Sequence, residues 1–248
     1  MAAITGKGTA MISLIIPAYN ESAVIENTVR ASAEALDRLG EEWELLVVDD
    51  GSADDTAARA QSAAGGRARV IRYAPNRGKG CAVRTGVLAS RGDVVFFTDA
   101  DLAYGLDVVG AALAVFRETG CDIVAGSRRL DREAYRAYPP MRRLASRCFA
   151  LGSRLLSGMC WDTQCGFKGF TREAADDVFS RCEEDRFAFD FEVMLTAEKR
   201  GYAIAQMPVR IVNHRASSVR LVRDSLRMAK SVLAIRRRLA AAVRGDTP

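Results

Sequence analysis

The chain has 248 residues, of which 49% are hydrophobic and 27% charged, which is ordinary for a globular protein with one α/β domain and an appendage. No stretch approaches the roughly 20 apolar residues of a membrane-spanning helix, so none is predicted. The net charge of +5 is uneven, because residues 215–248 hold nine Lys or Arg against two Asp and the remainder is slightly acidic. This distribution argues against a nucleic-acid-binding body and favours an anionic partner at the C-terminal end.

The cysteines give no sign of a metal site or of disulfides. The six cysteines include no Cys-x-x-Cys pair, and the sequence holds one histidine, so zinc is not expected. Residues 1–10 lack the apolar core of a secretion signal and are expected to be a disordered lead. Reduced thiols in a cytosolic protein are therefore predicted.

Apolar, β-rich runs alternate with helical patterns along the first half of the chain. The predicted strands cover residues 11–17, 43–48, 68–73, 93–98 and 123–125. The predicted helices cover residues 22–39, 53–64, 80–90 and a segment ending near 119. This alternation predicts βαβ units and a mostly parallel sheet with helices on both faces, in which ligands bind outside the carboxyl ends of the strands.

The segment Asp99-Ala100-Asp101 follows the apolar run 94–97, as two acids at the tip of a buried strand. As strand residues, Asp99 and Asp101 would point to the same side, because side chains alternate. Two hard oxygen ligands suit Mg²⁺ or Mn²⁺ that carries a diphosphate. A lone Asp-x-Asp is more often a polar turn, so this hypothesis depends on the rest of the chain.

Two other predicted strands also end in polar segments. Asp49-Asp50-Gly51-Ser52 can accept hydrogen bonds from a nucleotide, or it can be a turn with a helix N-cap. Asn76-Arg77-Gly78-Lys79-Gly80 is a glycine-rich turn before a helix, whose N-terminus favours a phosphate. The alternative for this second segment is a flexible basic loop.

In their order and spacing, these motifs resemble those of family 2 glycosyltransferases. They are Pro17-Ala18-Tyr19-Asn20-Glu21, Asp49-Asp50-Gly51-Ser52, Asn76-Arg77-Gly78-Lys79-Gly80, Asp99-Ala100-Asp101 and Gly126-Ser127-Arg128. Downstream, Asp162-Thr163-Gln164-Cys165-Gly166-Phe167-Lys168 resembles the polyprenyl-phosphate branch, which contains dolichyl-phosphate β-glucosyltransferases and mannose synthases. The resemblance covers roughly residues 11–235 and implies a Rossmann-like GT-A domain over residues 11–214.

The resemblance implies inverting, metal-dependent transfer of glucose or mannose from UDP-glucose or GDP-mannose to a polyprenyl phosphate. It assigns nucleotide-sugar binding to Pro17, Tyr19, Glu21, Asp49, Asp50, Arg77, Gly78 and Lys79. Of the two adjacent acids, Asp50 is the first choice for the nucleotide contact, and Asp49 is expected to have a more structural role. The resemblance assigns Mg²⁺ or Mn²⁺ to Asp99 and Asp101, with Asp101 as the more direct ligand. Ala103 stands where mannose synthases often carry Gln, which leaves a third protein ligand in doubt.

A phosphate acceptor has a second pKa of about 6 and needs cations near it more than it needs a base. Residues 127–154 supply eight arginines against two acids. By resemblance, Arg128, Arg142 and Arg143 would bind the lipid phosphate, and Asp162 and Gln164 would lie near the reacting centre. The alternative is a solvated basic loop and helix.

Asp190 leaves the acceptor class open. It could be a base, a contact to donor hydroxyls or a helix cap, and the base role would suit a rival function with a sugar hydroxyl as acceptor. A second rival is a non-catalytic nucleotide-binding or membrane-scaffolding protein. A nucleotidyltransferase is disfavoured, because its first loop is usually glycine-rich and basic.

The C-terminal segment 215–248 is predicted to hold a basic amphipathic helix. Apolar residues stand at 219, 222, 226, 229 and 233, and basic residues at 220, 223, 227 and 230. This spacing is typical of an in-plane interfacial helix on an anionic membrane surface, where each basic residue contributes about 1 kcal/mol. Peripheral attachment at the cytoplasmic face is therefore expected, with a core-packed or oligomerising helix as the alternative.

Overall fold

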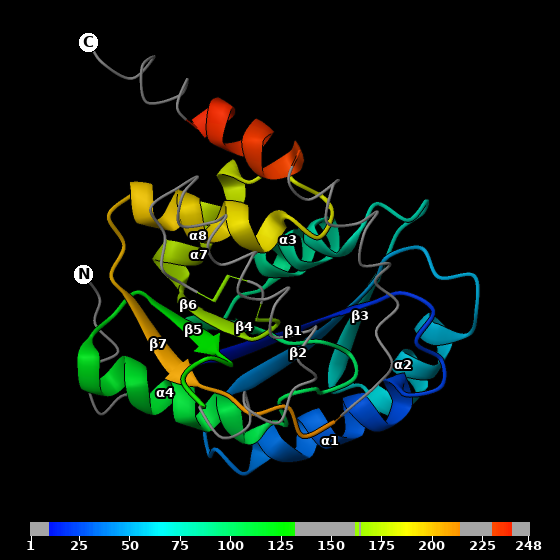
Figure 1. Cartoon of the computed structure of the whole chain (residues 1–248). Coiled ribbons are helices and arrows are strands. Elements are labelled where there is room, and N and C mark those ends of the chain that lie inside the picture. Colours follow the sequence, from blue (N-terminus) through cyan, green and yellow to red (C-terminus); the bar gives the residue numbers. More distant parts are fainter. Residues whose placement is uncertain (1–9, 132–161, 164, 214–229, 240–248) are drawn as a thin grey trace.

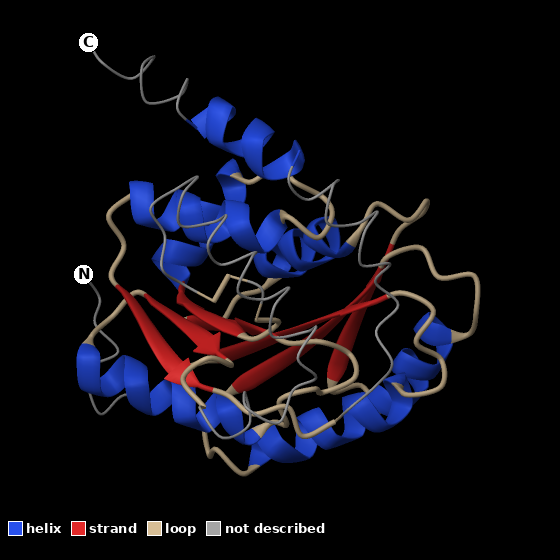
Figure 2. Ribbon diagram, in the orientation of Figure 1, coloured by secondary structure: helices blue, strands red, loops and turns tan. Residues whose placement is uncertain are grey.

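The computed structural model describes residues 10–131, 162–163, 165–213 and 230–239. These residues form a seven-stranded sheet with the strand order β3-β2-β1-β4-β6-β5-β7. Figures 1 and 2 show the sheet as a central layer with helices on both faces. The predicted α/β architecture is confirmed.

Five strands form where the sequence predicts them. They are β1 (Ile12–Ala18), β2 (Trp43–Asp49), β3 (Ala68–Arg72), β4 (Val94–Phe97) and β5 (Ile123–Ser127). The first four pair in parallel, with β1 between β2 and β4. All seven residues of β1 are buried, as a parallel strand covered on both faces requires.

Three elements beyond residue 131 were not predicted. They are β6 (Lys168–Thr171), α7 (Arg172–Arg181) and β7 (Ile204–Pro208). Strand β6 runs antiparallel to both of its neighbours, β4 and β5. It has only four residues, including a lysine and a glycine, so it lacks an apolar run of the kind that predicts β4.

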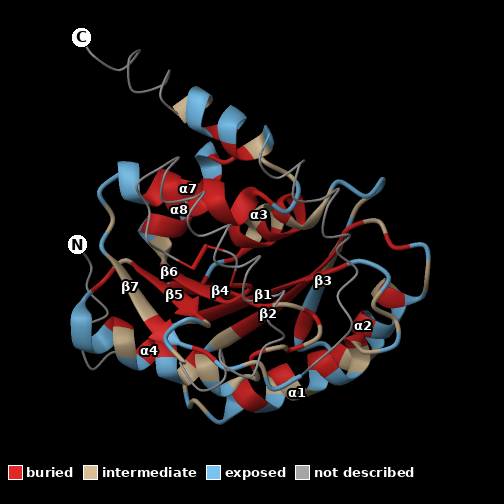
Figure 3. Ribbon diagram, viewed as in Figure 1, coloured by how far each residue is buried: buried red, intermediate tan, exposed pale blue. Residues whose placement is uncertain are grey.

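The helices divide between the two faces of the sheet, as Figure 1 shows. One face carries α1 (Ile25–Asp37), α2 (Thr56–Ala64) and α4 (Asp107–Thr119), and the other carries α3 (Lys79–Ala89), α7 and α8 (Phe189–Lys199). Each face has its own buried apolar cluster, and Figure 3 shows the buried residues along the sheet and on the helix sides that face it.

The end of β4 is fixed by aromatic packing on both faces. Phe96 stacks on Phe167 with ring centroids 5.8 Å apart, and Phe97 packs against Phe189 at 5.9 Å. Both strand residues are fully buried. This packing sets the position at which the chain leaves the sheet toward Asp99.

The C-terminal helix is described over residues 230–239, where one side is buried and the other exposed. Val232 and Ile235 pack against Phe191 and Met194 of α8, whereas Leu233 is 42% exposed. The remainder of 215–248 lies outside the described residues, so the interfacial helix stays a prediction. Among the helices described, none is long and apolar enough to cross a membrane.

Four cysteines lie in the described part of the chain and none forms a disulfide. They are Cys81, Cys121, Cys165 and Cys182, all buried. The other two cysteines lie outside the described residues, and the reduced state of the thiols stays a prediction.

Candidate functional site

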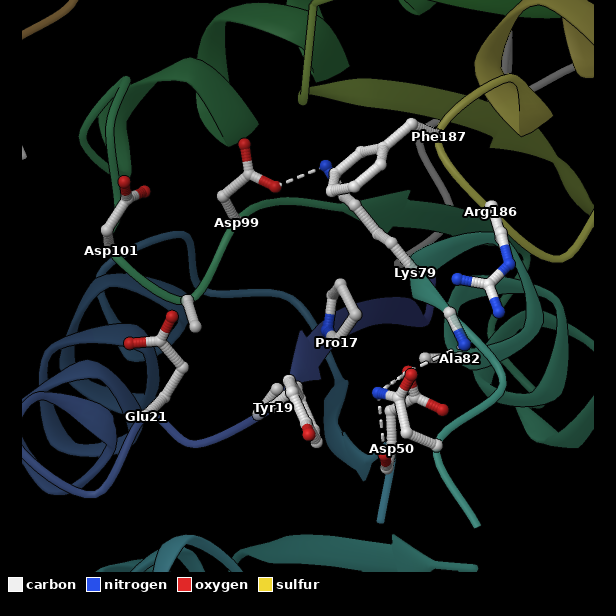
Figure 4. Close-up of a pocket in the computed structure, with 14 residues that line it drawn as sticks. Pro17, Tyr19, Glu21, Asp50, Lys79, Ala82, Asp99, Asp101, Arg186 and Phe187 are labelled. Atoms are coloured by element: carbon white, nitrogen blue, oxygen red, sulfur yellow. Dashed lines mark hydrogen bonds and ion pairs between the residues drawn. The ribbon is translucent and has the colours of Figure 1, made fainter. Parts of the chain in front are cut away.

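A pocket of about 500 Å³ opens at the carboxyl ends of β1, β2 and β4, in the size range of small-molecule sites. Its lining consists of Pro17, Ala18, Tyr19, Glu21, Asp50, Asn76, Gly78, Lys79, Ala82, Asp99, Ala100, Asp101, Arg186 and Phe187. Figure 4 shows Glu21 and Asp101 on one side of the pocket and Arg186 and Phe187 on the opposite side. The pocket thus joins eight of the predicted site residues at the edge of the sheet where parallel strands end.

The two acids that follow β4 are not strand residues. The strand ends at Phe97, and the Leu102 amide donates to the Asp99 carbonyl at 3.0 Å in a turn. The same-side orientation expected from strand alternation is therefore wrong. Instead, Asp99 points toward Lys79, whereas Asp101 lies on the side of Glu21 (Figure 4).

Asp99 is enclosed between a cation and a glycine. The Lys79 ammonium lies 2.5 Å from Asp99 Oδ1, and a Cβ atom on Gly166 would lie 2.1 Å from Asp99 Oδ2. Burial disfavours the charged form of Lys79, but the carboxylates of Asp99 and Asp190 outweigh burial and raise its pKa. The pocket therefore contains a permanent positive charge at the N-terminus of α3, where an anion is favoured.

The donor set suits a divalent cation that arrives with its own oxygen ligands. No group of three His, Cys, Asp or Glu side chains that could hold a metal occurs in the described part of the chain. Mg²⁺ commonly takes one or two carboxylates together with phosphates and water. Asp99 is paired with Lys79, and Asp101 Oδ1 accepts the Ala103 amide at 3.0 Å, so both predicted metal ligands have contacts of their own and their roles as ligands stay predictions.

Asp50 holds the loop that precedes α3. Its carboxylate accepts hydrogen bonds from Asn76 Nδ2 at 2.7 Å and from the Arg77 and Gly78 amides, each at 2.8 Å. Gly78 has a φ of +120° and would place a Cβ only 2.5 Å from the Asp185 carbonyl oxygen, so glycine is required there. The predicted nucleotide contact at Asp50 therefore also has a structural task.

Two residues predicted to contact the donor do not line the pocket. Asp49 is fully buried, accepts from the Ser52 amide at 3.1 Å and pairs with Arg72 at 3.1 Å. The Arg77 guanidinium turns to Asp185, 3.1 Å away. Neither contribution to donor binding is tested by this geometry, and both stay predictions.

Arg128 and Asp162, predicted near the acceptor, bind one another. Asp162 accepts Arg128 Nε at 3.1 Å and a terminal guanidinium nitrogen at 2.8 Å. Burial opposes ionisation of Asp162, but its hydrogen bonds and ion pair with Arg128 outweigh burial and hold the pKa of its carboxyl below 3.8. Arg142, Arg143 and Gln164 lie outside the described residues, so their roles stay predictions.

Lys168 is a buried organising residue whose importance the sequence analysis missed. Its ammonium is fully buried and donates to the Thr163 and Cys165 carbonyls at 3.1 and 2.7 Å and to Asp190 at 2.6 Å. Burial raises the pKa of Asp190, and the charges of Lys168 and Lys79 oppose that rise. Asp190 is not part of the pocket lining. The sequence signal that could have revealed it is a lysine with a phenylalanine and a glycine on each side. Such apolar neighbours indicate burial, and a buried lysine needs a charged or hydrogen-bonding partner.

Arg186 and Phe187 also line the pocket without having been predicted. They lie in the segment between α7 and α8, and Phe187 is 50% exposed. Neither residue belongs to a recognisable motif. Only the position of α8 in the folded chain brings them opposite Glu21.

Replacing Asp162 with Asn should destabilise the protein by about 2–3 kcal/mol at pH 7, because Arg128 loses its buried counter-charge. Asp162 has a lower pKa in the folded protein than its value of 3.8 in the unfolded chain, so its charge adds to the free energy of unfolding above pH 3.8. This stabilisation is lost as the pH falls through the folded-state pKa. The difference in unfolding free energy between the two proteins should therefore shrink below about pH 4 in urea titrations. A difference that grows on acidification would contradict this assignment.

The family model for "Glycosyl transferase family 2" matches residues 13–179. Dolichyl-phosphate beta-glucosyltransferase from Homo sapiens is 32% identical and covers 93% of this chain and 76% of that protein. The Dictyostelium discoideum protein of the same name is 31% identical, with 91% and 73% covered. Glycosyltransferase AglD from Haloferax volcanii is 34% identical over 94% of this chain, but the chain spans only 38% of AglD.

The fold is similar to that of solved glycosyltransferase structures. Glucosyl-3-phosphoglycerate synthase from Mycobacterium tuberculosis in complex with Mg²⁺ and UDP matches with a TM-score of 0.67 and 26% identity, over 91% of this chain and 78% of the other. The same enzyme with Mn²⁺ and UDP-glucose matches with a TM-score of 0.68 and 25% identity, over 91% and 77%. These similarities bear out the predicted GT-A-like fold.

Proposed function

Because the chain belongs to glycosyl transferase family 2, we propose that it transfers glucose from UDP-glucose to a polyprenyl or dolichyl phosphate. The observation that carries this proposal is the pocket that places Lys79, Asp99 and Asp101 together at the strand ends. Relatives named dolichyl-phosphate beta-glucosyltransferase support the acceptor, and the solved complexes with UDP and UDP-glucose support the donor. Mannose from GDP-mannose is the weaker alternative.

The pocket residues divide by their chemistry. Pro17 and Tyr19 offer apolar surface to the nucleobase, with Asp50 beside them as a hydrogen-bond acceptor. Lys79 and the N-terminus of α3 offer positive charge to the diphosphate. A bound Mg²⁺ or Mn²⁺, held by Asp101 with Asp99 near it, would supply Lewis-acid stabilisation of the leaving diphosphate.

The proposed reaction is a single displacement at the anomeric carbon. An acceptor phosphate oxygen forms a bond to C1 while the bond from C1 to the diphosphate breaks, which gives a β-linked product and free UDP. A phosphate monoester near its second pKa of about 6 is already a nucleophile, so no base has to take a proton from it. Asp190 is buried, binds Lys168 at 2.6 Å and is not itself among the residues that line the pocket, which supports a site that needs no base.

The exposed side of helix 230–239 supports a membrane-bound acceptor. Lys230, Leu233, Arg236 and Arg237 are all exposed there. A basic side with an apolar residue fits an anionic lipid surface, which the predicted helix upstream would extend. Attachment at the cytoplasmic face is part of the proposal.

The direct test offers the purified protein radiolabelled UDP-glucose or GDP-mannose, a short polyprenyl phosphate and Mn²⁺. Label from UDP-glucose should enter an organic-soluble product, and EDTA should abolish this transfer. No transfer from either donor, with the protein shown to be folded, would contradict the proposal.

A second candidate function is transfer to a hydroxyl group of a small acid. The similarity to glucosyl-3-phosphoglycerate synthase favours it, since that enzyme was crystallised with phosphoglyceric acid and with its glucosylated form. The same assay with 3-phosphoglycerate in place of the lipid separates the two. Transfer to 3-phosphoglycerate and not to the lipid would replace the first function by the second.

A further inference from the structure

The segment 183–187, between α7 and α8, forms one wall of the pocket through Arg186 and Phe187. It contains no helix or strand of its own. The two side chains that it presents are both exposed, so they are not held in place by burial. The position of this wall therefore depends on what holds the segment from behind.

On one side, the segment is fastened to α3. The Asp185 carboxylate binds Arg77 at 3.1 Å and Arg84 at 2.5 Å, and its carbonyl accepts the Cys81 amide at 3.1 Å. The approach is so close that a Cβ on Gly80 would lie 2.4 Å from the Glu184 carbonyl oxygen. The segment thus rests directly on the start of the helix that offers Lys79 to the pocket.

On the other side, the segment is held by Glu192 of α8. This carboxylate is fully buried and accepts the Glu184 amide at 2.7 Å and the Glu183 amide at 3.1 Å. A buried carboxylate needs a counter-charge as well as hydrogen bonds, because its loss of hydration is costly.

The counter-charge comes from the C-terminal helix. Arg238 forms ion pairs with Glu192 and, at 2.7 Å, with Glu183. The helix that carries Arg238 is itself anchored by Val232 and Ile235 on α8. A continuous set of contacts therefore runs from Arg238 through Glu192 to the pocket wall.

We propose that Arg238 is a positioning residue for nucleotide-sugar binding, which acts through Glu192 on the segment that carries Arg186 and Phe187. The inference rests on the proposed function, since it assigns the pocket to a nucleotide sugar. Arg238 does not line the pocket, so its loss should change donor affinity and leave the reacting groups in place. Removal of Arg238 leaves the buried Glu192 carboxyl without its counter-charge, and the segment that depends on Glu192 loosens.

The test compares Arg238→Gln with Arg237→Gln, which makes the same change of charge on the adjacent, exposed residue of the same helix. Calorimetry with UDP and Mn²⁺ should show about tenfold weaker binding for Arg238→Gln, as a small misplacement of a binding wall can cause. The KM for UDP-glucose should rise by a similar factor with kcat within about twofold. Arg237→Gln should match the wild type in its affinity for UDP, which does not depend on the proposed lipid surface, and Arg238→Lys should recover part of the affinity.

Two further measurements keep the proposal falsifiable. If Arg238→Gln folds poorly, the double variant Glu192→Gln/Arg238→Gln removes the buried charge and should regain stability. Its affinity for UDP should stay below that of the wild type, because a neutral amide at position 192 holds the Glu183 and Glu184 amides more weakly than the carboxylate does. Hydrogen exchange of residues 183–187 should accelerate in Arg238→Gln and not in Arg237→Gln, whether or not a nucleotide binds.

Equal UDP affinity and equal exchange in folded Arg238→Gln and wild type would overturn the positioning role. Failure of the wild type to bind UDP would instead overturn the proposed function. Even then, hydrogen exchange at residues 183–187 would decide whether Arg238 holds the segment. A fall in kcat with unchanged KM would also contradict the proposal, because it would place Arg238 in the chemical step.

Discussion

Replacing Asp101 with Asn is expected to lower the rate of sugar transfer by about a thousandfold, or about 4 kcal/mol of transition-state stabilisation, while the protein stays folded. Under the proposed function, Asp101 lines the pocket and supplies its charge to a cation on the donor diphosphate, whereas Asp99 is paired with Lys79. Asparagine keeps the oxygen that accepts the Ala103 amide and removes only the charge. The measurement is kcat/KM for UDP-glucose at saturating Mn²⁺, together with the thermal midpoint.

Asp107→Asn is the matched control for this variant. Asp107 is an exposed acid six residues further along, in the first turn of α4. Its replacement should leave transfer within about twofold of the wild type, because Asp107 is not among the residues that line the pocket. Near-normal activity of folded Asp101→Asn would refute the metal assignment, and loss of activity in both variants would point to a general effect of charge.

Replacing Lys168 with Met is expected to cost about 3–5 kcal/mol of stability, because it leaves Asp190 buried without its partner. Three acceptors lose their donor together, namely the Asp190 carboxylate and the carbonyls of Thr163 and Cys165. The sheet itself would keep its pairing, since Lys168 contributes to β6 through its backbone. Urea unfolding followed by circular dichroism measures the change.

The pH dependence of this variant identifies the cause. Burial already raises the pKa of Asp190, and loss of Lys168 should raise it further. A carboxyl with a raised folded pKa is best tolerated when protonated, and stability is lost as the pH rises through that pKa. The destabilisation should therefore be smaller at about pH 5 than at about pH 8.

Two controls complete this test. Lys230→Met removes an exposed lysine and should change stability by less than about 0.5 kcal/mol. The double variant Lys168→Met/Asp190→Asn removes both buried charges and should recover most of the loss. A double variant as unstable as Lys168→Met alone would show that the ion pair is not the source of the effect.

The N-terminal half of the fold could be predicted because its signals are local. Strands β1, β2 and β4 are largely apolar runs that are followed by polar residues, and the helix α1 between the first two carries apolar residues at helical spacing. Strand β6 has no such signal, since it is held by its pairing with β4 and β5 rather than by its composition. Its antiparallel direction is a property of the assembled sheet that no short stretch of sequence encodes.

The residues of the candidate site also fall into those that the sequence predicts and those that only packing brings to the pocket. Lys79 begins the helix that follows one predicted strand, and Asp101 lies in the turn that follows another, so chain order was enough to bring them together. Arg186 and Phe187 reach the pocket from more than 80 residues away, through contacts of Asp185 and Glu192 that depend on packing. The mutual pairing of Arg128 and Asp162 was equally invisible, because their separation in the sequence says nothing about which charges meet.

The burial of Val232 and Ile235 on α8 affects where the protein can be divided. The boundary expected at residue 214 separates a catalytic body from a tail, yet the described helix completes an apolar cluster that includes Phe191 and Met194. A truncation at that boundary would expose these side chains to water and strip Glu192 of its counter-ion. We therefore expect the helix and the body to unfold together, since Val232 and Ile235 attach the exposed basic side of residues 230–239 to the helix that carries Glu192.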